Sequence, residues 1–145
     1  MSTKTTVKGN KRPFSASTPA NAISFLVQNQ LHEDLNSVEV VKVVAVDAGG
    51  PRSAAGYVDV LPLVCRVDTY DNIVPTTTMY RLPYSRIQGG VAALVIDPEP
   101  GDVGLAVFTK LDSTTVAAGQ NEPVRPGSFR MFDRANGFYV GGLLN

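Results

Sequence analysis

The sequence predicts a mainly β protein, built as a small five-stranded barrel with one N-terminal α-helix and an extended N-terminal arm. Three observations lead to this fold class. One stretch near the N-terminus has helical apolar spacing, at least five short β-branched runs follow it, and proline, glycine and aspartate separate those runs. The 145 residues are enough for one domain with a modest core. No segment repeats, so a solenoid or repetitive shaft is not encoded in this sequence.

The segment 1–17 is polar and basic, and we expect it to be an irregular arm. The basic residues that precede the first acidic residue of the chain, Glu33, are Lys4, Lys8, Lys11 and Arg12. This part carries a charge of +4, and the other 9 basic and 13 acidic residues give the remainder −4. A basic arm can contact nucleic acid or an acidic surface, or it can simply be solvated. The acidic remainder argues against a nucleic-acid-binding domain, because phosphate contacts dominate such binding.

The segment 18–36 is predicted to contain an amphipathic helix over residues 19–35. Thr18 is a typical N-cap residue, and Pro19 suits the first helical position. Apolar side chains then recur every four residues and form a stripe, which Phe25 and Leu26 widen. The stripe comprises Ile23, Val27, Leu31 and Leu35. This face can either cap the barrel or contact another chain.

The segment 37–145 is predicted to form the barrel domain. Its β-type runs are residues 38–46, 57–67, 76–82, 91–96 and 103–108. Pro62 lies inside the second run and predicts an edge strand or a bulge there. Residues 97–101 predict a tight turn that joins the last two runs as a hairpin, with Gly101 supplying a left-handed backbone conformation. Five strands of this size fit an OB-fold, and a β-sandwich is the alternative.

The remaining segments are predicted to be connections, apart from a short closing element. Residues 68–75 predict a loop, and residues 129–132 and 137–140 predict a hairpin-like close. Cys65 is the only cysteine, which rules out an internal disulfide. It lies in an apolar run and is predicted to be a reduced core residue, as in a protein made in a cytosol.

No catalytic, cofactor or metal site is predicted from the polar residues. The single histidine, His32, lies in the predicted helix without a cysteine cluster, and we expect it to be a surface residue. Asp68, Asp71 and Asn72 lack the spacing of an EF-hand loop and are interpreted as turn formers.

A second acidic group, Asp97, Glu99 and Asp102, surrounds two prolines and a glycine, which favours a turn over an acid–base pair. Ser85 and Ser128 have no base close to them in the sequence. The tyrosines on or near the strands are interpreted as core and interface residues, and they are Tyr57, Tyr70, Tyr80 and Tyr84. The chain is therefore predicted not to be an enzyme.

A family resemblance rests on two groups of residues. The first is Leu82-Pro83-Tyr84-Ser85-Arg86-Ile87-Gln88-Gly89-Gly90, with Asp97-Pro98 and Gly101-Asp102-Val103-Gly104. The second is Pro126-Gly127-Ser128, Arg130-Met131-Phe132 and Gly137-Phe138-Tyr139-Val140-Gly141-Gly142. Together they resemble the N-terminal barrel domain of the membrane-puncturing central spikes of contractile phage tails. The match spans most of residues 38–142, and the first group is fairly specific.

The resemblance implies an OB-fold, a homotrimer around the tail axis and attachment to a baseplate hub protein. It implies a place in the virion tail baseplate, after synthesis in the cytoplasm of the host bacterium. Known spikes of this family continue into a trimeric β-helix, and some bind iron at the tip through a His-x-His pair. This sequence has neither feature, so no iron ligand is carried over. We expect either a longer spike or a separate tip protein to complete the point.

The predicted interface residues lie on two apolar segments. Those of the helix are Ile23, Phe25, Val27 and Leu31, and those near the C-terminus are Phe138, Tyr139, Val140, Leu143 and Leu144. No apolar run approaches the ~20 residues that span a bilayer, so the host envelope would be contacted mechanically. No nucleic acid is expected as a partner. Two alternatives remain open: an OB-fold nucleic-acid binder that uses the basic arm, and a small enzyme such as a lysozyme-like module.

Overall fold

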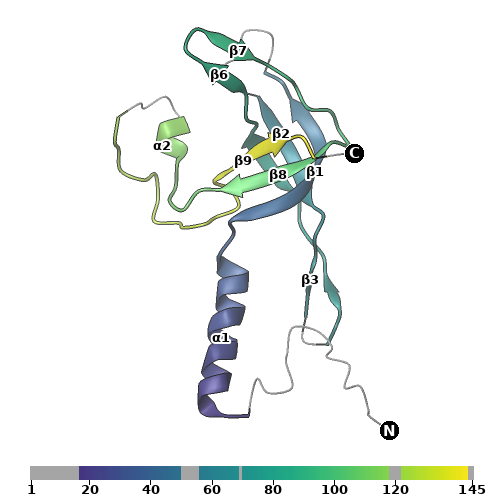
Figure 1. Cartoon of the computed structure of the whole chain (residues 1–145), viewed down its shortest axis with the longest axis vertical. Coiled ribbons are helices and arrows are strands. Elements are labelled where there is room, and N and C mark those ends of the chain that lie inside the picture. The colour runs from purple at the N-terminus through teal and green to yellow at the C-terminus, as the bar shows by residue number, and fades with distance from the viewer. Residues whose placement is uncertain (1–16, 50–55, 69, 118–121, 144–145) are drawn as a thin grey trace. The chain divides into compact units, whose positions relative to one another are not determined.

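The computed structural model describes residues 17–49, 56–68, 70–117 and 122–143 (Figure 1). These residues fall into two compact units. The first contains the described residues up to 35 together with segment 65–76, and the second contains residues 36–64 and those from 77 onward. The second unit is the barrel, and the first contains the N-terminal helix and a two-stranded ribbon.

The barrel unit is built on one five-stranded antiparallel sheet. Its strands are β1 (Val38–Asp47), β2 (Tyr57–Pro62), β5 (Met79–Pro83), β8 (Val103–Phe108) and β9 (Gly137–Gly141). Their order in the sheet is β5-β2-β1-β8-β9. A parallel bridge between Tyr84 and Tyr139 joins the two outer strands, and the Ser85 amide donates to the Tyr139 carbonyl at 2.7 Å. The sheet thus curls into a partly open barrel with OB-fold strand order, which confirms the predicted mainly β fold class.

The core lies inside this curled sheet and follows from the two-residue period of its strands. In β2 and β8 every second residue is buried, as in Val58 and Val60 of β2 and Ala106 and Phe108 of β8. Other fully buried side chains are Val41, Val43, Leu82 and Tyr139. The alternation therefore fixes the register, because a slip of one residue would turn the core face outward.

The predicted hairpin between residues 91–96 and 103–108 is wrong. Residues 92–94 form β7 (Ala92–Leu94), which pairs with β6 (Ile87–Gly89) across a turn in which Gly90 has φ +58°. β8 instead lies between β1 and β9. Gly101 does adopt the predicted positive φ, +110°, but in the connection to β8 rather than in a hairpin turn. Figure 1 shows the β6–β7 hairpin projecting beyond the barrel strands.

The second predicted strand, 57–67, also divides in two. β2 ends at Pro62, and β3 (Arg66–Val67) pairs with β4 (Ile73–Val74) in a separate ribbon. β4 lies within residues 68–75, which were predicted to be a loop. β2 lies between β1 and β5, so Pro62 occupies the last position of an interior strand rather than an edge or a bulge. A proline has no amide hydrogen to donate, and β2 ends there, although the Leu63 amide still donates to the Val40 carbonyl at 2.9 Å.

The closing hairpin predicted for residues 129–132 and 137–140 does not form. β9 pairs with β8 along its whole length, and Met131 makes an isolated bridge to Leu111 instead. A one-turn helix, α2 (Thr114–Ala117), begins the long connection between β8 and β9. The strand was therefore placed correctly, but its partner was not.

In the first unit, α1 (Pro19–Asp34) agrees with the predicted helix within one residue. Thr18 is the N-cap, and its Oγ1 accepts a hydrogen bond from the Asn21 amide at 3.2 Å. Cys65 is exposed, so its prediction as a core residue is wrong. It lies between the end of β2 at Pro62 and the start of β3 at Arg66, where the chain has left the barrel sheet.

Candidate functional site

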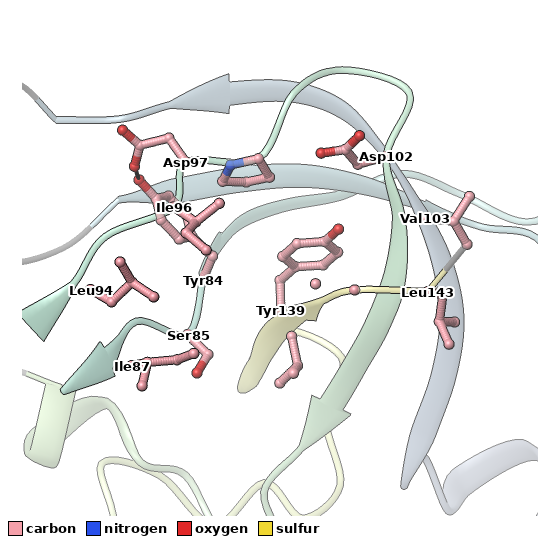
Figure 2. Close-up of a pocket in the computed structure, with 14 residues that line it drawn as sticks. Tyr84, Ser85, Ile87, Leu94, Ile96, Asp97, Asp102, Val103, Tyr139 and Leu143 are labelled. Atoms are coloured by element: carbon pink, nitrogen blue, oxygen red, sulfur yellow. Dashed lines mark hydrogen bonds between the residues drawn. The ribbon is translucent and has the colours of Figure 1, made fainter. Parts of the chain in front are cut away.

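A cleft of about 430 Å³ lies in the barrel unit, beside the seam between β5 and β9. The segment after β5 runs beside β9 as far as Ser85 and then diverges from it into the β6–β7 hairpin, so the seam opens. Figure 2 shows Ile87, Leu94 and Ile96 on the hairpin side, with Val103 and Leu143 across from them. The walls of the cleft are therefore mainly aliphatic, and its polar groups lie toward Asp97 and Asp102.

A hydrogen-bonded group of three side chains closes one end of the cleft. The Tyr84 hydroxyl donates to Asp97 Oδ1 (Figure 2), and Arg86 Nη2 donates to the same hydroxyl at 3.0 Å. The Arg86 guanidinium also lies 3.7 Å from the Asp97 carboxylate and 5.2 Å from the centre of the Tyr84 ring. This cluster ties the segment before the hairpin to the segment after it.

The environment of Tyr84 keeps its hydroxyl protonated. Burial raises the pKa of Tyr84, and its hydrogen bond to Asp97 raises this pKa further, while Arg86 acts in the opposite direction. A Cβ atom at Gly56 would lie 2.0 Å from Tyr84 Cε1, so only glycine leaves room for the ring. Tyr84 is thus a packed hydrogen-bond donor, and its cluster with Arg86 and Asp97 forms a clamp between the two segments.

Tyr139 forms the base of the cleft and belongs to the core. Burial raises the pKa of Tyr139, and the nearby charge of Asp102 raises this pKa as well. Its hydroxyl is buried and has no hydrogen-bond partner among the described residues. A Cβ atom at Gly104 would lie 2.6 Å from both Tyr139 Cε2 and the Val140 carbonyl oxygen, so β8 needs glycine at this position.

The acidic segment 97–102 forms one rim of the cleft. Asp102 Oδ2 accepts a hydrogen bond from the Glu99 amide at 2.9 Å, and the Asp102 amide donates to the Glu99 carbonyl at 3.1 Å. These bonds agree with the predicted turn role of Glu99 and Asp102. Asp97 differs, because its carboxylate is held by Tyr84 and Arg86.

A second polar cluster holds the connection between β8 and β9. Asp112 is buried and accepts hydrogen bonds from the hydroxyls of Ser128 at 2.6 Å and Thr114 at 2.7 Å, and from the Thr114 amide at 3.0 Å. These donors, chiefly Ser128, lower the pKa of Asp112 from 3.8 to about 2, and Arg130 lies 3.9 Å away. The cluster fixes the loop and leaves no free base at Ser128.

The structure separates the predicted interface residues into exposed and buried ones. On α1, Ile23, Val27 and Leu31 are exposed, and Phe25 is half-buried. Near the C-terminus, Val140 and Leu143 are partly exposed and Phe138 is half-buried. Tyr139 is the exception, because its side chain is in the core and cannot serve a partner. Leu144 lies outside the described residues.

The other candidates from the sequence lie apart from the cleft. Asp68 accepts hydrogen bonds from the amides of Tyr70 and Asn72, both at 2.8 Å, which agrees with the predicted turn. Tyr70 and Tyr80 are exposed, contrary to a core role. The His32 side chain is outside the described part. Among the described residues, no group of three or more His, Cys, Asp or Glu side chains could hold a metal ion, and no helix is long and apolar enough to cross a membrane.

Sequence reasoning missed the clamp formed by Tyr84, Arg86 and Asp97. These residues are 2 to 13 positions apart, and no periodic pattern links them. They do occur together in the first group of residues that resembles the spike family. No known protein-family profile matches the chain, and no similar sequence was found among curated proteins.

Proposed function

We propose that this chain is a structural component of the central spike of a contractile phage tail or a tail-like particle. It would form a homotrimeric plug beneath the baseplate hub protein and help to puncture the host envelope. In this role it belongs to the virion tail baseplate and is made in the cytoplasm of the host bacterium. A separate tip protein or a longer spike would provide the point.

One observation carries this proposal: residues of the spike-like pattern contact one another across the barrel. Tyr84 and Arg86 meet Asp97 at the clamp, and Gly104 of the pattern makes room for Tyr139. Gly137 likewise faces Leu82, since a Cβ atom there would lie 2.8 Å from Leu82 Cδ2. The residues of the pattern therefore pack together in the fold. This supports a similarity of fold to the spike domains rather than a chance similarity of sequence.

The function proposed is mechanical, and the barrel suits it. Strands that are hydrogen-bonded on both sides resist shear, and β1, β2 and β8 each have two partners. The backbone bridge between Tyr84 and Tyr139 closes the seam between β5 and β9 at one point. Load along the tail axis would then pass through the backbone ladder, and no acid–base chemistry is required.

The exposed apolar stripe of α1 supports assembly with other chains. Ile23, Leu26, Val27 and Leu31 are all exposed in the described chain. Three copies around an axis need self-complementary apolar surface, and the exposure of this stripe supports such a contact. The same stripe could meet the hub, so the trimer itself must be measured.

Light scattering after size exclusion tests the proposal on the full chain. We expect a mass near three times 15.4 kDa, which Val27→Asp reduces toward the mass of one chain. Val116→Asp is the matched control, because Val27 is 52% exposed and Val116 is 55% exposed. A monomeric wild-type chain, or an equal effect of both substitutions, would contradict the trimeric plug.

A second candidate function is nucleic-acid binding, and one observation favours it. On the β2–β5 face, Tyr80 is exposed and the Arg81 guanidinium lies 4.7 Å from the centre of the Tyr57 ring. This face of an OB-fold can stack bases. We rank it second because the chain outside the basic arm is acidic. Binding of a single-stranded oligonucleotide that weakens steeply with salt and is lost in Tyr80→Ala would reverse this ranking.

A further inference from the structure

One edge of β9 faces the cleft. On this edge the backbone of Tyr139 is hydrogen-bonded, whereas no strand pairs with the backbone of Gly141 among the described residues. The Tyr139 carbonyl accepts from Ser85 across the seam at 2.7 Å, whereas the Asn136 carbonyl, three residues earlier, accepts from Thr109 on the opposite side at 3.1 Å. Backbone groups two residues apart in a strand point to the same side. Gly141 therefore presents its amide and carbonyl toward the cleft, and no strand pairs with it there among the described residues.

The side chains around this edge form an apolar channel without a covering group. Ile87, Leu94 and Ile96 are well exposed on the hairpin side, and Leu143 is partly exposed on the barrel side (Figure 2). Val140 also lines the cleft and is partly exposed. Gly141 adds no side chain that would block the approach of another backbone. An open strand edge beside an apolar channel is the arrangement by which a sheet accepts an added strand.

The rim of the channel is acidic. Asp97 and Asp102 line it, Glu99 lies exposed between them, and no lysine or arginine is among its described lining residues. Arg86, which contacts the rim, is paired with Asp97. Charge complementarity therefore favours an occupant that carries lysine or arginine.

We propose that this cleft binds an extended segment of a partner protein, in which aliphatic side chains alternate with at least one lysine or arginine. The segment adds to the edge of β9 at Gly141, its aliphatic side chains enter the channel, and its cation lies at the rim near Glu99 and Asp102. This goes beyond the plug function and does not depend on the trimer. A second copy docked symmetrically is a poorer occupant, because its acidic rim would face this one.

The test uses the full chain and peptides selected from a random library. The peptides are about ten residues long, which matches a long strand. We expect the selected peptides to be basic and rich in valine, isoleucine and leucine, and to bind more weakly as salt is raised. Fluorescence anisotropy then measures their affinity for the wild-type chain and for each variant.

Ile87→Ala and Glu99→Gln should each weaken binding, the first by about tenfold, the effect of one well-packed interface side chain. Ile73→Ala is the matched control, because Ile73 and Ile87 are both 70% exposed and only Ile87 lines the cleft. Leu94→Ala is a second cleft variant, and circular dichroism checks that each variant is folded.

Three results would overturn the proposal. The selection could yield no binders or acidic ones, or Ile73→Ala could weaken binding as much as Ile87→Ala does. The third result is that another copy of the chain fills the cleft. In that case Ile87→Ala would have a lower mass than the wild type in light scattering, and peptides would bind this variant but not the wild-type chain. A wild-type monomer that still binds basic peptides at the cleft would reject the trimeric plug and keep this inference.

Discussion

The barrel and α1 use the same kinds of apolar residue in opposite ways. In the barrel, the valines and leucines that follow the two-residue period are buried against one another. In α1, the residues that follow the four-residue period remain exposed within the described chain. Both segments are regular in sequence and in structure, so regularity alone does not tell which apolar face belongs to a core.

The difference concerns what each region has as a partner. The barrel strands supply one another with covering surface, and burial of apolar area contributes about 25 cal/mol per Å² to folding. A lone helix of this length gains little from its backbone alone, since most helical stability in proteins comes from packing. The apolar face of α1 therefore lacks a covering surface among the described residues, whereas the apolar faces of the barrel strands cover one another.

The largest expected effect comes from making one substitution in both regions. Leu82 is 1% exposed in the barrel, and Leu26 is 65% exposed on α1. Leu82→Ala should lower the free energy of unfolding by about 2–5 kcal/mol, because it leaves a cavity in the core. Leu26→Ala should change it by less than about 0.5 kcal/mol at a dilution where the chain is monomeric. Urea titrations followed by circular dichroism measure both, and similar losses would remove the contrast between the regions.

Much of this contrast was predictable from the sequence, because local signals decide it. Thr18 and Pro19 mark the start of α1, and the β-branched run from Val38 marks β1. Four of the five runs assigned to the barrel contain strands of its sheet, whereas the run at 91–96 does not, and β9 completes the sheet instead. These features depend on neighbours in the chain, which a sequence displays directly.

Pairing was predicted less well, because it depends on residues far apart. The run at 92–94 was assigned to the following strand, yet it pairs with residues 87–89 across Gly90. The contact of Tyr84 with Asp97 has no local signature either. The cleft follows from these two features, so its shape could not be read from periodicity.

The second prediction compares the packed barrel with the projecting hairpin. A Cβ atom at Gly104 would lie 2.6 Å from the Val140 carbonyl oxygen, whereas a Cβ atom at Gly89 would meet nothing within 4 Å. Gly104→Ala should therefore cost about 1–3 kcal/mol of unfolding free energy, as overpacking does. Gly89→Ala should lie within about 0.5 kcal/mol of the wild type. Equal denaturation midpoints for the two variants would show that β8 can move away from β9 freely.

The third prediction distinguishes two buried tyrosines that line the same cleft. Tyr84→Phe removes a hydroxyl that bonds to Asp97 and Arg86, and we expect a loss of about 1–2 kcal/mol. Tyr139→Phe removes a hydroxyl without a partner among the described residues, and we expect no loss or a gain of up to about 1 kcal/mol. Thermal and urea unfolding of the two variants measure the difference. A clear loss in Tyr139→Phe would mean that its hydroxyl has a partner in solution.

The smallest effect concerns the loop between β8 and β9 and appears only in acid. The pKa of Asp112 is about 2 in the folded chain, whereas an aspartate without these contacts has a pKa of 3.8. Because the folded value is the lower one, this carboxylate stabilises the fold above pH 3.8, and the contribution is lost as the pH falls through that value toward 2. Ser128→Ala removes the largest cause of the shift, so its melting temperature should fall less over this window than that of the wild type.

Ser85→Ala is the control for this pH series, because Ser85 makes no described hydrogen bond to a carboxylate through its side chain, whereas the Ser128 hydroxyl lies 2.6 Å from Asp112 Oδ2. The control should show the wild-type decline with pH. If the melting temperature of Ser128→Ala also declines as that of the wild type does, Asp112 does not cause the acid sensitivity of this loop. If the decline is reduced as expected while α1 keeps its helicity throughout, the acid-sensitive element belongs to the barrel, and the contrast between the two regions extends from packing to charge.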